Sequence, residues 1–98
     1  VALKEPPMRI LYLMIKQFNT LYEVRDLAVK GYPASAIAEK TAIRDFIVKR
    51  NISLGRHFEI TALREAVAYG TELEEEIKTG RITDRLAVEL MIQKYSRA

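Results

Sequence analysis

Apolar residues recur every three to four positions along almost the whole chain, which is the spacing of one face of an α-helix. An alternating apolar and polar pattern, typical of strands, never extends beyond four residues. Proline, glycine and threonine occupy the breaks in the helical pattern, where helices commonly begin and end. The pattern predicts an all-α domain, a single compact bundle of about five helices, near residues 7–30, 33–41, 44–54, 60–79 and 84–95.

The same spacing predicts which side of each helix faces the core. On the fourth expected helix the inward positions follow one another in steps of three and four residues. Thr83 is expected to cap the fifth helix. The expected inward residues are Leu11, Met14, Ile15, Phe18, Leu21, Tyr22, Ile37, Ala38, Ile60, Leu63, Val67, Gly70, Leu73, Ile77, Leu86, Ala87, Leu90 and Met91.

The first and last expected helices carry more apolar residues than one buried face requires. Such a helix is buried on two sides, or is buried on one side and meets a partner on the other. We therefore expect a partner interface on these two helices, and the alternative is that the same side chains complete the core of the domain itself. The expected contact residues are Tyr12, Leu13, Val88, Ile92 and Tyr95.

Length and composition indicate one domain without a membrane segment. The 98 residues suffice for one small core, and the absence of cysteine excludes a disulfide framework and fits a reducing cytoplasm. No apolar stretch approaches the roughly 18 residues of a membrane span, and no signal peptide is visible. We expect a cytoplasmic fragment with no membrane partner, in which residues 1–7 are a remnant of an inter-domain linker and residues 8–98 are the helical domain.

No constellation of catalytic residues is visible. The four glycines fit neither the phosphate-binding loop nor the dinucleotide-binding motif, and His57 is the only histidine. Lys78-Thr79-Gly80 is a helix end rather than part of a catalytic motif, and the glutamates between positions 72 and 76 spread around their helix. We expect no enzymatic activity, no cofactor and no metal site.

Residues 33–56 have an alternative interpretation as a helix-turn-helix DNA-binding module. Basic residues exceed acidic ones by four between positions 30 and 64, and Arg44, Lys49 and Arg50 are possible phosphate contacts. The amides best suited to reading base edges, Gln17 and Asn51, lie on different elements, and the net charge of +3 favours nucleic acid only weakly. Any DNA contact is therefore expected to be indirect or weak.

Several phrases of the sequence, in order, resemble the C-terminal domain of the bacterial DNA polymerase III delta subunit. The resemblance runs from about residue 5 to residue 95, and each phrase alone is short. Asp45, Ala42 and Glu59 stand where that family commonly has proline, glycine and a capping serine, so the fourth helix can start nearer Thr61. The matching phrases are 5–7 leading into 10–18, Ile37-Ala38, 45–49, 56–59 and 77–81.

The resemblance implies a place in DNA replication. Delta subunits of this family have three domains and belong to a five-subunit clamp loader with delta-prime and gamma/tau subunits. Their N-terminal domain, outside this sequence, opens the sliding clamp, and delta itself is not an active ATPase. The C-terminal domains of the five subunits pack into a collar. The resemblance therefore implies a collar-type fold and a non-catalytic oligomerisation domain, with other clamp-loader subunits as partners.

Overall fold

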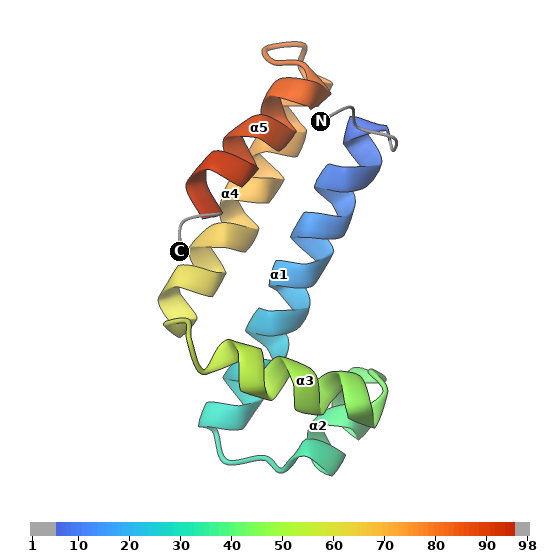
Figure 1. The fold of residues 1–98 in the computed structure, drawn as a ribbon, viewed down its shortest axis with the longest axis vertical. Helices are drawn as coiled ribbons and strands as arrows, with labels where there is room; N and C mark the ends of the chain where they lie inside the picture. The colour runs from blue at the N-terminus through green and yellow to red at the C-terminus, as the bar shows by residue number, and fades with distance from the viewer. Residues whose placement is uncertain (1–5, 96–98) are drawn as a thin grey trace.

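The computed structural model describes residues 6–95, which form five α-helices (Figure 1). Each expected helix is present, its ends fall within one residue of the expected ones, and the prediction of an all-α, five-helix bundle is confirmed. Most of the expected linker, residues 1–5, lies outside the described residues. The helices are α1 (Pro7–Val29), α2 (Ala34–Thr41), α3 (Asp45–Gly55), α4 (Ile60–Lys78) and α5 (Asp84–Tyr95).

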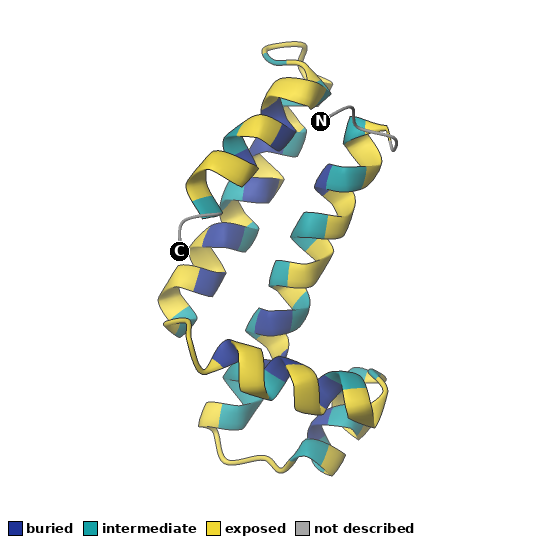
Figure 2. Cartoon of the chain, in the orientation of Figure 1, coloured by how far each residue is buried: buried dark blue, intermediate teal, exposed yellow. Residues whose placement is uncertain are grey.

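Helix α1 is the central element and contacts all four other helices. Helices α4 and α5 lie side by side along its first half, whereas α2 and α3 lie across its far end (Figure 1). The buried residues line the surfaces that α1 shares with its neighbours (Figure 2). Most of them form two clusters, one of Leu11, Leu73, Ala87, Val88 and Met91 between α1, α4 and α5, and one of Val24, Ile37 and Val48 between α1, α2 and α3.

Local chemistry explains where most helices begin and end. Gly31 follows α1 with a positive φ of 95°, a conformation that glycine adopts without a steric cost. Thr83 caps α5 as expected, since its hydroxyl accepts a hydrogen bond of 3.1 Å from the Leu86 N–H. Glu59 makes no side-chain cap, yet α4 begins directly after it at Ile60 and is not shortened toward Thr61.

Helix α5 is rotated relative to the prediction from its sequence. Ala87, Val88 and Met91 face the core, whereas Leu86, expected to be inward, is exposed. Helix α5 packs against both α1 and α4, so its buried stripe is centred between these two neighbours. Leu86 lies about 200° around the helix from Val88, because successive residues turn by about 100°, and cannot share that stripe.

Ala42 adopts a strained backbone conformation in the turn between α2 and α3. It ends α2 in the left-handed region, with φ 61° and ψ 21°, and is the only non-glycine residue with positive φ among the described residues. For an L-residue with a Cβ atom this conformation costs roughly 1–2 kcal/mol, which glycine avoids. A glycine at position 42 would therefore adopt this turn without the steric cost that alanine has there.

We predict that Ala42→Gly stabilises the domain. Relief of the left-handed strain exceeds the backbone entropy that glycine adds to the unfolded chain, so the expected gain is about 0.5–1 kcal/mol. For a domain of this size that raises the melting temperature by roughly 3–6 °C, which thermal circular dichroism measures. As a control, Ala36→Gly within α2, where φ is helical, should lower the melting temperature.

Candidate interaction surfaces

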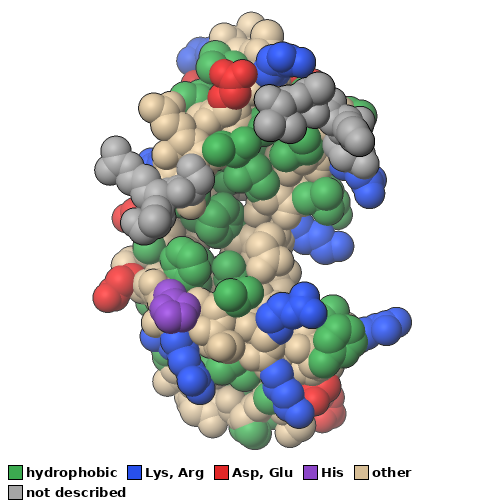
Figure 3. Space-filling view, viewed as in Figure 1, with side chains coloured by type: hydrophobic (Ala, Val, Ile, Leu, Met, Phe, Trp, Pro, Cys, Tyr) green, Lys and Arg blue, Asp and Glu red, His purple; other side chains and the backbone are tan. Residues whose placement is uncertain are grey.

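An apolar groove runs along one side of α1. It has a volume of about 390 Å³ and is lined by Ile10, Leu13, Met14, Gln17 and Phe18. Figure 3 shows hydrophobic side chains gathered along the strip between α1 and α5, on the face of the molecule that this view presents. Four of the five lining side chains are apolar, so the groove leaves hydrocarbon in contact with water in the isolated domain.

Three of the expected contact residues lie at the surface. Tyr12, Leu13 and Ile92 are 56%, 46% and 44% exposed. Leu13 lines the α1 groove, whereas Tyr12 lines a separate hollow between α1 and α4, next to Val67 and Thr71. Tyr12 and Leu13 therefore face different sides of α1, and a single flat partner surface does not cover both.

Of the other two expected contact residues, Val88 belongs to the core of the domain and Tyr95 is partly buried against it. Val88 is 1% exposed and packs in the cluster with Leu11 and Met91, so its assignment to a partner interface was wrong. Its position in the stripe between α1 and α4, where both neighbours cover it, is the physical reason. The expectation that Val88 touches a partner came from the incorrect rotation of α5.

The Tyr95 ring also packs inside the domain. Its centre lies 5.0 Å from that of Phe18 and 6.2 Å from that of Tyr69, in tilted and edge-on arrangements that favour aromatic pairs. The hydroxyl is buried and has no hydrogen-bond partner among the described residues. Burial raises the pKa of this phenol above its ordinary value, with smaller contributions from Tyr69 and Glu65. Tyr95 therefore supports the last turn of α5 through its ring, and its role as a partner contact stays a prediction.

A pair of amides lies at one end of the groove. Gln17 Nε2 donates a hydrogen bond of 3.3 Å to Asn51 Oδ1, and Asn51 Nδ2 donates one of 2.8 Å to the Ile47 carbonyl. Asn51 is 2% exposed and is the one fully buried polar side chain of the described core. The two amides that the sequence offered for reading base edges thus join α1 to α3.

The basic residues in α3 and at its N-cap lie at the surface. Arg44, Lys49 and Arg50 are exposed, and Lys49 forms an ion pair of 3.0 Å with Asp45 one turn earlier. Phe46, which is 57% exposed on the same helix, was not among the residues expected to form a functional surface. Its spacing of three and four residues from Lys49 and Arg50 was the available signal, since residues so spaced share a helix face.

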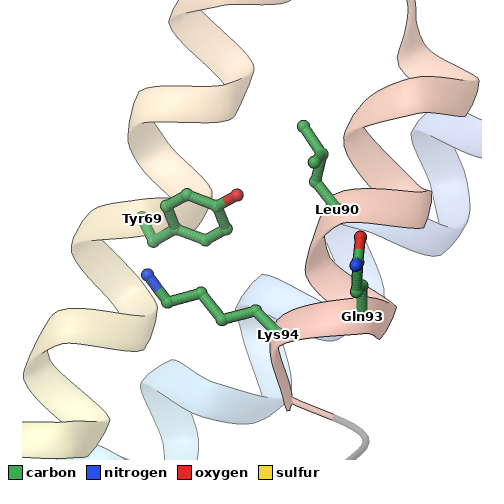
Figure 4. Close-up of a pocket in the computed structure, with 4 residues that line it drawn as sticks. All are labelled: Tyr69, Leu90, Gln93 and Lys94. Atoms are coloured by element: carbon green, nitrogen blue, oxygen red, sulfur yellow. The ribbon is translucent and has the colours of Figure 1, made fainter.

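A shallow hollow between α4 and α5 holds no catalytic arrangement. It has a volume of about 350 Å³ and is lined by Tyr69, Leu90, Gln93 and Lys94 (Figure 4). The Lys94 ammonium lies 4.2 Å from the centre of the Tyr69 ring, where the electron-rich face attracts it. The contact fastens the end of α5 to α4, which is a structural role.

The described residues also show no metal site or membrane helix. Within positions 6–95, no three side chains of histidine, cysteine, aspartate or glutamate come close enough together to hold a metal ion. None of the five described helices is both long and apolar enough to cross a membrane. The exposed surfaces of α1, α3 and α5 therefore remain as the candidate functional features of this part of the chain.

Comparison with known proteins places the domain in a family. The sequence profile described as DNA polymerase III delta subunit, C-terminal domain, matches residues 1–95. DNA polymerase III subunit delta of Bacillus subtilis (strain 168) is 28% identical over 88 residues, which are 90% of this chain and 25% of that protein. The solved structure of the Bacillus subtilis DNA clamp loader delta protein superposes with a TM-score of 0.86 at 27% identity, over 93% of this chain and 27% of that one. The chain spans about a quarter of the length of either relative, and it belongs to the family formed by the C-terminal domains of DNA polymerase III delta subunits.

Proposed function

We propose that this domain is the oligomerisation module of a delta subunit, packing against other clamp-loader subunits of the gamma/tau and delta-prime type during DNA replication. In this proposal the domain catalyses nothing itself and works in the cytoplasm as part of a longer subunit. Family membership supports the setting, because the relatives are described as DNA polymerase III subunit delta and clamp loader delta protein. Contact with the sliding clamp is left to parts of the subunit outside this chain.

The apolar α1 groove is the observation that carries the proposal. The side chains of Leu13 on α1 and Ile92 on α5 are nearly half exposed, although both belong to helices whose other faces are buried. Ile92 follows the core residue Val88 by one helical turn, so it borders the α5 surface that packs on α1. Burial of such side chains stabilises a complex by about 25 cal/mol per Å², before the cost of ordering the partners.

The proposed occupant of the groove is an apolar helix face of a neighbouring subunit. A groove on the flank of one helix accepts ridges of side chains spaced by three and four residues on another helix. Tyr12, on the other side of α1, would in that case contact a second neighbour or only the rim of the first. The domain would then lie between two subunits, as a ring-shaped assembly requires of each member.

We predict that Leu13→Glu and Ile92→Glu each prevent assembly with the neighbouring domains while leaving the fold intact. Each change places a carboxylate where the proposal buries hydrocarbon, and an unpaired buried charge is strongly unfavourable. Both side chains are exposed in the isolated domain, so the helix content should not change. Light scattering on a size-exclusion column, with the C-terminal domains of gamma/tau and delta-prime from the same organism, measures the mass of the complex.

Gln93→Glu is the matched control. Gln93 is the next residue on α5, but it lines the hollow beside α4 and does not line the α1 groove. This variant should assemble like the parent domain. Normal assembly by both Leu13→Glu and Ile92→Glu would contradict the proposed interface, and equal disruption by Gln93→Glu would show that the effect is only general charge repulsion.

A further inference from the structure

The outer face of α3 combines an aromatic ring with positive charge. Val48, Asn51 and Gly55 point inward, so the opposite side of the helix is fully open to solvent. Phe46 lies on that open side and is 57% exposed, the highest exposure of any large hydrophobic residue in the described chain. The exposed residues of α3 that share this side with Phe46 are Lys49, Arg50 and Ser53, and we call these four residues the α3 face.

The residues that follow Phe46 in α3 and in the turn after it carry only positive charge. Between positions 46 and 58 the sequence has three basic residues, Lys49, Arg50 and Arg56, and no acidic one. Figure 3 shows Lys and Arg side chains spread over the region of α3. The carboxylate of the preceding residue, Asp45, forms an ion pair with Lys49, but both side chains are more than half exposed. Such a surface pair is weak, so it leaves Lys49 able to contact another anion.

This chemistry fits a polyanion that also offers flat rings. Lys and Arg bind phosphates, and an exposed phenyl ring offers a platform on which a base stacks. An acidic peptide would use the cations but not the ring, because the negative face of an aromatic ring does not attract carboxylates. Duplex DNA hides its base faces in the stack, and the buried Asn51 cannot read base edges from this helix.

We propose that the α3 face binds single-stranded nucleic acid, with Phe46 stacking on a base and Lys49, Arg50 and the nearby Arg56 contacting the flanking phosphates. The site shares no residue with the α1 groove, which is lined by α1 residues alone. The inference does not depend on the proposed oligomerisation function, and variants of one surface leave the other unchanged.

The test is a fluorescence anisotropy titration of the 98-residue chain with labelled oligothymidine of about 20 nucleotides, longer than the footprint of a small domain. The logarithm of the binding constant should fall with the logarithm of salt concentration with a slope of about −2, or roughly −0.7 for each of three phosphate contacts. Phe46→Ala should weaken binding about tenfold, the effect of a lost base stack, and Lys49→Ala with Arg50→Ala should reduce the slope to about −0.7.

Two further variants separate the α3 face from general charge attraction. Asp45→Asn removes the carboxylate that competes for Lys49 and should tighten binding. Arg85→Ala removes one exposed positive charge from α5 and should change binding little. Thermal circular dichroism confirms that each variant is folded before its titration is interpreted.

Several outcomes would overturn the assignment. These are an absence of strand binding by the parent chain, unchanged affinity of Phe46→Ala, and an effect of Arg85→Ala as large as that of the double α3 variant. Equal affinity for a duplex of the same length, or for a labelled glutamate-rich peptide, would also overturn it, because either result would leave Phe46 without its stacking role.

Discussion

Replacing Asn51 with aspartate is expected to lower the free energy of unfolding by about 3 kcal/mol at neutral pH. The change preserves size and shape, but it puts a carboxylate at a position that is 2% exposed. The donor to the Ile47 carbonyl disappears, and a negative charge then faces that oxygen across the former 2.8 Å hydrogen bond. Gln17 supplies one remaining donor, which compensates only part of the lost hydration.

The loss should depend on pH in a defined direction. Burial and the facing carbonyl raise the pKa of the carboxyl introduced by Asn51→Asp in the folded state, above its unfolded value of about 3.9. The folded state therefore binds the proton more tightly, and the stability lost at neutral pH returns as the pH falls through the folded-state pKa. Urea denaturation of variant and parent at each pH gives the difference.

Asn51→Leu is the control for this experiment. It removes the same hydrogen bonds without adding a charge, so its loss should be smaller and should not change with pH. If the aspartate and leucine variants lose the same stability at every pH, the Asn51 site is open to water and its described burial is incorrect.

Replacing Gly70 with alanine is expected to destabilise the domain although alanine is the better helix former. A Cβ atom at Gly70 would lie 2.5 Å from Ile15 Cγ1 and 3.1 Å from its Cδ1. Either the Ile15 side chain or helix α4 must then shift, and such overpacking costs roughly 1–3 kcal/mol. The gain of about 1 kcal/mol in helix propensity offsets only part of this cost. Chemical denaturation should therefore show a net loss of up to about 2 kcal/mol.

A second substitution tests the cause of that loss. Ile15→Ala alone removes packing and should destabilise the domain, but it also removes both atoms that approach the new Cβ most closely. The double variant should therefore lose less stability than the sum of the two single-variant losses, by at least about 1 kcal/mol. Additive losses, or a Gly70→Ala variant that melts above the parent, would contradict the close approach of α1 and α4.

The helix boundaries were predictable because their causes are local. Gly31 ends α1 through its own backbone conformation, and Thr83 caps α5 through its own hydroxyl. Both do so at the positions predicted from the sequence. The stripe on α4 was predictable as well, since its steps of three and four residues admit one inward face, and Leu63, Gly70 and Leu73 are buried.

The rotation of α5 and the exposed surfaces depend on neighbours that sequence periodicity does not specify. Helix α5 carries apolar residues on several sides, so its sequence does not single out one inward face. Its contacts with α1 and α4 decide that Val88 is buried and Leu86 exposed. The groove has a related origin, because Leu13 and Phe18 face it from one helix while no other element covers that flank within the described chain. The exposure of Phe46 was not predicted, because an aromatic residue in an apolar helix is expected to be buried.

The most direct test of the proposed packing role is to map which amides change when the domain binds a neighbouring C-terminal domain. Nitrogen-15 correlation spectra of the labelled chain, titrated with unlabelled gamma/tau or delta-prime domain, report each backbone amide separately. The proposal predicts shifts concentrated at residues 10–18 of α1 and around Ile92 of α5, with little change on α3. Shifts confined to α3, or an unchanged spectrum with both partners present, would contradict it.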